Sequence, residues 1–373
     1  MKTPDQRFDD MCAKYHVRRF APAVSEYGKL FQYQRKLFEA RVERSRNTLL
    51  ANSPIDFCFD FIDRGIINAW AKMSDDVALI ALCKGTIYLP LEAFCRMFSD
   101  PGVHPGIGEA GLESRGPQHS DPLPLNFDEL VAIREKQGRN TMPQPPKGAT
   151  RCQYVRVCIQ VVCDFFVIHE ISHAVHGHFG LLESWSISSP MTGGNLPPID
   201  YQAVEMLADL EAACGSLDAF LGRKIVGPAQ WNLAEPRIRL YFWVFALTTA
   251  FLLLDMFIDP DDLSNERHPP EPMRFSSIIV AAQAYLDNKH PELAKEFGLI
   301  SRDAQLDVSL AMGRINGPMM DNSSLADFND SRVQKHRTDL INHMGTVLSE
   351  LPTYAYIDMP EVDFSSDTPN PTP

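Results

Sequence analysis

The sequence predicts a mainly helical α+β fold with a small antiparallel β-sheet, and two patterns lead to this prediction. Residues 55–91 contain short apolar runs, and the run IDFCFDFIDR alternates apolar and polar residues with the period of two typical of a strand. Most other segments repeat apolar residues at helical spacing, above all the stretches 151–179 and 236–258. With 373 residues, 45% of them apolar and 22% charged, the chain can bury a large core.

The chain divides into three parts. Residues 1–54 predict an amphipathic helical arm, because apolar residues recur there at helical spacing among many Lys and Arg. Residues 55–350 form the main domain, which contains a long loop rich in Pro and Gly at 99–150. This loop is either a lid or substrate-binding element or simply flexible, and the sequence leaves both interpretations open. Residues 351–373 predict a disordered tail by their composition.

The strands and helices of the main domain follow from local signals. The expected strands are 55–64, Ile66–Ala71 and Val77–Leu91, the last with a turn signal at Lys84-Gly85. The expected helices are 91–98, 126–136, 151–179, 201–221, 236–258, 273–288, 303–312 and 331–348. Asn126 or Asp128 and then Asp200 are the expected N-caps, and Gly180 is the expected C-cap of the helix that begins at 151.

Composition excludes several classes of function. The net charge of −13 argues against general binding of nucleic acid and against a basic membrane-surface role. The eight cysteines form no C-x-x-C pair, and several lie in strongly apolar segments, which favours reduced thiols. The first twelve residues, MKTPDQRFDDMC, contain no apolar stretch typical of a secretory signal. Together these features predict a cytoplasmic protein.

The segment Leu240–Ile258 is long enough to cross a membrane. Asp255 lies inside it, and a charge within a membrane span is costly. Candidate site residues also lie on both sides of this segment in the chain, so a single span would separate them. We therefore expect a buried core helix and no membrane association, with a membrane-bound protease as the alternative.

The stretch FVIHEISHAVHGH, residues 166–178, contains the motif H-E-x-x-H. On a helix, residues four apart lie on one face, so His169 and His173 can direct two imidazole nitrogens at one zinc ion. Glu170 then lies beside the metal and can act as a general base toward a water molecule. Because the motif alone can occur by chance, it needs further ligands to support it.

A third ligand can come from the predicted helix 201–221. Glu205 and Asp209 are four residues apart and share a face, so Glu205 can bind the metal while Asp209 fixes the orientation of a histidine ligand. The rival third ligands are Glu211, His176 and His178. Glu211 faces away from Glu205 on the same helix, and His178 is expected to cap the end of the preceding helix.

These residues together resemble the gluzincin metallopeptidases of the HtpX and CAAX prenyl protease group. The family pattern has H-E-x-x-H with another His five residues on, then E-x-x-A-D, then H-P-P-x-x-x-R. The chain has HEISHAVHGH, then EMLAD, then His268-Pro269-Pro270 with Arg274. Upstream, Ile67–Ala71 (INAWA) and the later Gly85–Leu89 resemble the family's hairpin and its following strand. The likeness covers roughly residues 55–290.

The resemblance implies a role for each matching residue. His169, His173 and Glu205 match the ligands of one zinc ion per chain, and Glu170 matches the general base. His268 matches a histidine that can stabilise the oxyanion, and Asn68 an edge-strand residue that holds the substrate backbone. Asp209 and Arg274 match a buried carboxylate and its arginine partner.

The sequence therefore predicts a zinc-dependent endopeptidase with a gluzincin fold, acting on a protein or peptide substrate. It departs from the named group in lacking an apolar pair of spans between His173 and Glu205, so a prenylated or membrane substrate does not follow. The alternative from another class is a catalytically silent gluzincin-like sensor or partner-binding module. That alternative predicts the loss of at least one site residue, and all of them are present.

Overall fold

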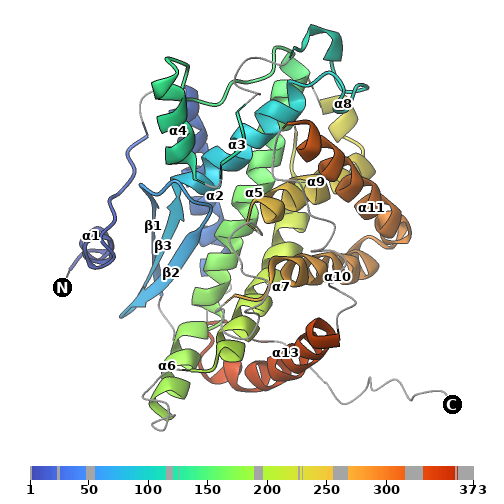
Figure 1. The fold of residues 1–373 in the computed structure, drawn as a ribbon. Helices are drawn as coiled ribbons and strands as arrows, with labels where there is room; N and C mark the ends of the chain where they lie inside the picture. Colours follow the sequence, from blue (N-terminus) through green and yellow to red (C-terminus); the bar gives the residue numbers. More distant parts are fainter. Residues whose placement is uncertain are drawn as a thin grey trace, which may run out of the picture.

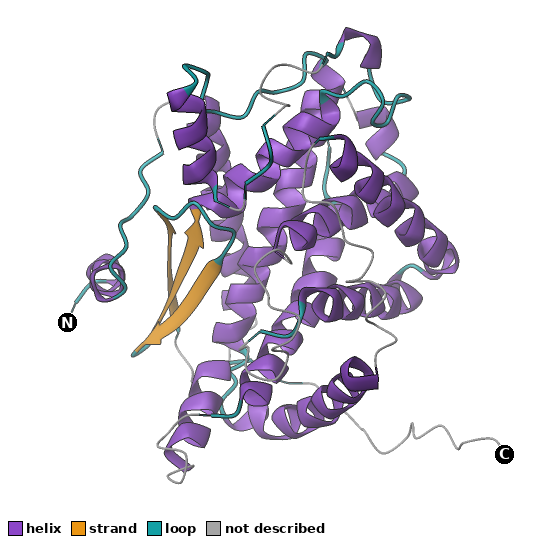
Figure 2. Ribbon diagram, in the orientation of Figure 1, coloured by secondary structure: helices purple, strands orange, loops and turns teal. Residues whose placement is uncertain are grey.

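The computed structural model describes most of the chain and shows a helical body with one small sheet at its side (Figures 1 and 2). The described residues are 2–22, 26–47, 55–114, 121–124, 126–188, 196–225, 227–228, 230–254, 268–315, 331–357 and 359. The strands are β1 (Asp56–Ile62), β2 (Ala69–Ser74) and β3 (Val77–Cys83). The helices before the HExxH motif are α1 (Pro4–Lys14), α2 (Glu26–Arg46), α3 (Lys84–Phe98), η1 (Ala110–Leu112) and α4 (Phe127–Lys136).

The HExxH motif lies on α5 (Ala149–Val175), which runs through the centre of the molecule (Figure 1). The helices after it are α6 (His178–Ser188), α7 (Pro198–Gly222), α8 (Gln230–Leu233), α9 (Pro236–Leu254), α10 (Glu271–Lys289), α11 (Pro291–Arg314), α13 (Ser331–Glu350) and η6 (Leu351–Thr353). The prediction of a mainly helical α+β protein is confirmed.

The sheet differs from the predicted antiparallel one. Its strand order is β1-β3-β2, with β2 antiparallel to β3 but β1 parallel to β3. The segment 63–68 carries the chain from β1 past β3 to the opposite edge, and the β2–β3 hairpin then returns β3 in the direction of β1. The prediction of a purely antiparallel sheet is therefore wrong, because local alternation shows a strand but not its partner.

The Lys84-Gly85 pair marks a helix start instead of a turn. β3 ends at Cys83, and Lys84 opens α3, so the predicted strand Val77–Leu91 is half helix. A Cβ atom on Gly85 would lie 2.2 Å from the Gly65 carbonyl oxygen, so glycine is required for this close approach of two backbone segments.

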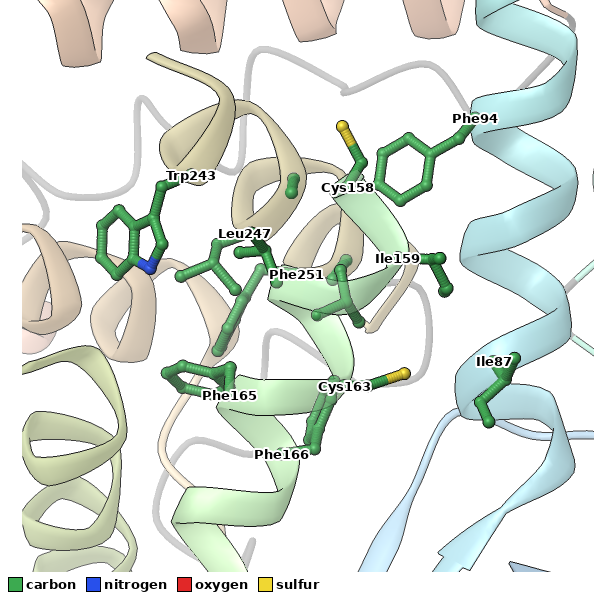
Figure 3. Packing of buried hydrophobic residues seen from close by; sticks show 14 of the residues in the cluster. Ile87, Phe94, Cys158, Ile159, Cys163, Phe165, Phe166, Trp243, Leu247 and Phe251 are labelled. Atoms are coloured by element: carbon green, nitrogen blue, oxygen red, sulfur yellow. The ribbon is translucent and has the colours of Figure 1, made fainter. Parts of the chain in front are cut away.

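The helix α5 is surrounded by apolar side chains on nearly every face. Phe165 of α5 meets Phe251 of α9, with ring centroids 5.6 Å apart, and Figure 3 shows Ile87 and Phe94 of α3 on the other side. Burial of this many aromatic and aliphatic groups is the main stabilising term for the central helix. The N-terminal arm is part of the same core, because α2 contributes buried apolar side chains, Phe31 among them.

The helix α5 ends earlier than predicted. Its last residue is Val175, and Gly177 then adopts a positive φ of 74° before α6 begins at His178. Gly180 therefore lies inside α6 and is not the C-cap. The positive φ at Gly177 breaks the helix, and a side chain there would also collide with the Tyr354 carbonyl oxygen, 2.1 Å from a Cβ atom.

Among the described helices, α9 alone is long and apolar enough to cross a membrane, and 72% of its apolar window is buried inside the structure. It packs against α5 and α11, as expected for a core helix. Residues 255–258, the end of the predicted apolar segment, lie outside the described residues.

The first part of the loop 99–150 is tied to the N-terminal end of α5. The buried guanidinium of Arg151 donates five hydrogen bonds, of 2.5 to 3.1 Å, to main-chain carbonyls between Phe98 and Ile107. At 1.5 Å per residue, Arg151 lies about 27 Å along the helix from His169. This part of the loop is therefore remote from the HExxH motif. Farther along the loop, Asn126 caps α4 as predicted.

The C-terminal segment 351–357 packs against the body of the protein, although the sequence assigns it to the tail. Leu351 is 1% exposed, and the Tyr356 amide donates to the Val175 carbonyl over 2.8 Å. Residue 358 and residues 360–373, the rest of the predicted tail, lie outside the described residues.

His104 gives a testable pH dependence. Its ring packs among Phe98, Phe242 and Phe245, and burial lowers its pKa to about 4. Between pH 6.5 and 4 the unfolded state binds a proton that the folded state does not, so unfolding free energy falls as pH falls, by up to about 3 kcal/mol. We expect His104→Phe to remove this component, measured as the difference between the urea-unfolding curves of the two proteins across this pH range. If the two proteins differ in unfolding free energy by the same amount at pH 7 and at pH 4, His104 does not contribute this pH dependence.

Candidate metal centre

The two histidines of the motif face each other on α5. His169 and His173 are one helical turn apart and buried, and their Nε2 atoms are 3.1 Å apart. Two imidazoles brought this close without a shared hydrogen would repel through their lone pairs, so this arrangement suits two donors directed at a common cation.

Glu205 of α7 completes the group. Its Oε2 is 3.2 Å from His169 Nε2, and its Oε1 is 3.4 Å from His173 Nε2. The helices α5 and α7 pack along their lengths, which brings residues 169 and 205 together. The three rival third ligands do not belong to the group formed by His169, His173 and Glu205 in the described part of the chain. Glu211 is exposed, and His176 pairs with the Ser172 hydroxyl. His178 contacts the far side of His173.

These three side chains can hold one metal ion. One donor atom from each lies within 4.8 Å of the others, and both histidines are buried. Four ligands placed tetrahedrally at the usual zinc distances of about 2.0–2.1 Å are themselves about 3.3 Å apart. The three observed separations of 3.1, 3.2 and 3.4 Å match that value. The donor set of two imidazoles and one carboxylate also suits zinc.

The far side of His169 is held by a buried carboxylate. His169 Nδ1 lies 2.9 Å from Asp209 Oδ1, one turn after Glu205 on α7. With the proton on Nδ1, beside this carboxylate, the Nε2 lone pair is free for a cation. Arg274 of α10 in turn holds Asp209 through two hydrogen bonds of 2.7 and 2.9 Å. The predicted pairing of Asp209 with Arg274 is thus present in the structure.

His178 orients the second histidine, a role that the sequence did not predict. Its Nδ1 lies 2.9 Å from His173 Nδ1, and its side chain is fully buried at the start of α6. Burial lowers the pKa of His178 well below its usual value, so the ring is neutral and can accept the proton on His173 Nδ1. The only signal for this was the spacing of five residues after His173, which was interpreted as a helix cap.

Glu170 and His268 lie at the same centre. Glu170 is 6% exposed, and burial raises its pKa, which suits a group that must gain and lose a proton. His268 precedes α10, with Nδ1 3.2 Å from Glu205 Oε2, and half of its side chain is exposed. The structure therefore brings His268 to the open side of the group.

Asn68 lies at the start of β2 and outside the His–His–Glu group. Thr86 Oγ1 accepts from the Asn68 amide over 2.9 Å and donates to the Asn68 carbonyl over 2.7 Å. The Asn68 side-chain Oδ1 accepts from the Ala69 amide. Its main chain is thus held in place at the start of the edge strand.

Acidic groups outnumber fixed basic groups around the two histidines. Among the described residues, Arg274 is the one guanidinium that pairs with these carboxylates: it contacts Asp209 and Glu271, while Glu170 and Glu205 lie beside the histidines. Such an excess of buried carboxylates is costly unless a cation neutralises it. The electrostatics of the centre therefore favour a bound divalent cation.

Comparisons of the chain with protein-family models, with curated proteins and with solved structures find no match.

The His173–His178 contact predicts an effect on metal affinity. We expect His178→Phe to weaken zinc binding by about 10–100-fold, the usual effect of removing a hydrogen-bonding partner of a histidine ligand. Competition with a chromophoric chelator measures the affinity, and His290→Phe, at the distant α10–α11 junction, is the matched control. Equal zinc affinity of the two variants would contradict the orienting role.

Proposed function

We propose that the protein is a zinc-dependent endopeptidase of the gluzincin type, acting on a protein or peptide substrate in the cytoplasm. The observation that supports it most directly is the spacing of three donor atoms from His169, His173 and Glu205, which matches three corners of a zinc tetrahedron. The motifs HExxH, ExxAD and HPPxxxR, which resemble those of the HtpX and CAAX prenyl protease group, support it as well. The likeness of Gly85–Leu89 to a strand of that group gives no support, because these residues lie in the helix α3.

The protein groups around the metal have separate tasks in this proposal. A bound zinc ion would supply a Lewis acid that polarises the peptide carbonyl. Glu170 takes a proton from the attacking water and returns it to the leaving amine. His268, on the exposed side of Glu205, donates a hydrogen bond to the oxygen that gains negative charge. Asp209 and His178 keep the two histidine rings in place.

The sheet offers a place for the substrate backbone. β2 pairs with β3 along one edge, and no described strand pairs with its other edge. An extended peptide can add to such an edge through main-chain hydrogen bonds. Because β2 packs against α5, a peptide bound there runs beside the HExxH helix. Asn68 stands at the start of this edge.

Metal analysis tests this proposal directly. We expect one zinc ion per chain in the purified protein, loss of casein cleavage after chelation, and its return with added zinc. Glu205→Ala removes a ligand, and Glu211→Ala, an exposed glutamate on the same helix, is its control. Absence of zinc binding, or equal zinc content of the two variants, would refute the proposed site.

A further inference from the structure

A cavity of about 320 Å³ lies at the C-terminal end of α5. Three segments line it: the end of β2, the turn between α5 and α6, and the C-terminal segment 353–356. Its lining residues are Met73, Ala174, Gly177, Phe179, Gly180 and Thr353–Tyr356. Its volume is at the lower end of the range for ligand-binding pockets, about 300–1,000 Å³.

The C-terminal wall of this cavity is held firmly. The Tyr356 amide donates to the carbonyl of Val175, and the Tyr354 hydroxyl donates to Ser184 Oγ over 2.8 Å. The absence of a side chain at Gly177 lets the Tyr354 main chain approach α5 closely. The cavity is therefore a defined feature of the fold and not a gap between mobile segments.

The cavity adjoins the candidate metal centre. Ala174 follows the ligand His173 directly, and Met73 stands on the face of β2 that packs toward α5. Trp70, by contrast, packs on the opposite face with α1. Because side chains alternate along a strand, a peptide paired with the free edge of β2 directs every second side chain to the face of Met73.

The walls of the cavity determine which side chains fit. They combine apolar and aromatic groups, including Met73, Phe179 and Tyr356, with exposed polar atoms, and none of the described lining residues is charged. A charged side chain placed there would find no side chain of opposite charge among the described lining residues to offset the hydration it loses. A large apolar side chain would instead bury its surface against aromatic rings.

We propose that this cavity binds one large apolar side chain, such as Phe or Leu, of an extended peptide substrate. The role of the cavity in substrate recognition rests on the proposed endopeptidase function, whereas its ability to bind an apolar side chain does not. It makes the C-terminal segment 351–357 a substrate-recognition element.

Binding of single amino-acid amides tests the cavity without any catalysis. With 13C-methyl methionine in the full chain, and the Met73 signal assigned through Met73→Leu, the probes are N-acetyl-phenylalaninamide, N-acetyl-leucinamide and N-acetyl-aspartamide. We expect the first two to shift the Met73 methyl signal saturably and the third to leave it unchanged. No saturable shift with the apolar probes, or an equal shift with all three, would overturn the proposal.

A variant tests the aromatic wall. Tyr356→Ala keeps the main-chain bond to Val175, and Tyr33→Ala, on the outer part of α2, is the control. We expect Tyr356→Ala to weaken binding of the phenylalanine probe about fivefold or more. Circular dichroism and the Met73 signal of the free variant show whether the cavity is intact. Binding as tight as in the control would overturn the proposal.

Cleavage specificity connects the cavity to the proposed reaction. On a peptide library, we expect the wild type to prefer Phe, Leu or Met over Asp and Lys at one fixed position relative to the cleaved bond, and Tyr356→Ala to lose this preference. A flat profile at every position would overturn the recognition role. If the protein binds no zinc and cleaves nothing, the proposed function fails, whereas the probe titration still decides whether the cavity binds apolar side chains.

Discussion

Replacing Glu170 with Gln is expected to lower peptide hydrolysis by about 10²–10⁴-fold while zinc remains bound. The amide of glutamine has nearly the same shape as the carboxylate but cannot accept the proton of the attacking water. The ligand atoms of His169, His173 and Glu205 stay in place because Glu170 is not among them. Cleavage of casein and zinc content, measured on the same preparations, test both halves of this expectation.

The matched control for this variant is Glu183→Gln, which removes an exposed carboxylate from α6. It should keep both full activity and full zinc content. If Glu170→Gln hydrolyses casein as fast as this control, Glu170 is not the general base and the proposed mechanism is wrong. If Glu170→Gln loses its zinc, the glutamate supports the metal itself, which also contradicts the assigned role.

Replacing Arg274 with Met is expected to destabilise the fold by about 3–5 kcal/mol. Asp209 is fully buried, and burial alone would raise its pKa, but Arg274 holds its pKa below the usual value. Without the guanidinium of Arg274, the Asp209 carboxylate still contacts His169 but no longer has an arginine beside it. Chemical unfolding of the metal-free protein measures the loss without a contribution from bound zinc.

Arg302→Met is the control, because Arg302 and its partner Asp303 are both largely exposed. A surface pair of this kind contributes little, so we expect a change within about 0.5 kcal/mol. The double variant Asp209→Asn with Arg274→Met should lose less stability than Arg274→Met alone, since the buried charge of Asp209 is removed together with its arginine partner. Equal unfolding free energies for Arg274→Met and Arg302→Met would refute the proposed contribution of the buried pair.

Residue spacing on helices indicated which side chains of the candidate centre share a helical face. His169 with His173 and Glu205 with Asp209 are each four residues apart, and any helix places such pairs on one face. The structure brings these faces together and adds Arg274 at Asp209, as expected. Burial of α9 was also predicted, from Asp255 within the apolar segment and from the candidate site residues on both sides of it.

Contacts between distant segments could not be predicted in the same way. The pairing of β1 with β3 depends on the path of residues 63–68, and alternation within a strand does not define its neighbour. Lys84-Gly85 looked like a turn because glycine is common in turns. In the fold, Gly85 instead allows the main chain to lie close to that of Gly65, because it has no side chain.

The sequence by itself determined the helical faces that carry His169, His173, Glu205 and Asp209, because helix geometry is local. Only the tertiary structure decided that His178 supports His173 and that Tyr356 closes a cavity beside them. Both contacts depend on how the chain turns after α5. That turn forms where Gly177 breaks the helix and the C-terminal segment packs against it, a contact between residues almost 180 positions apart in the sequence.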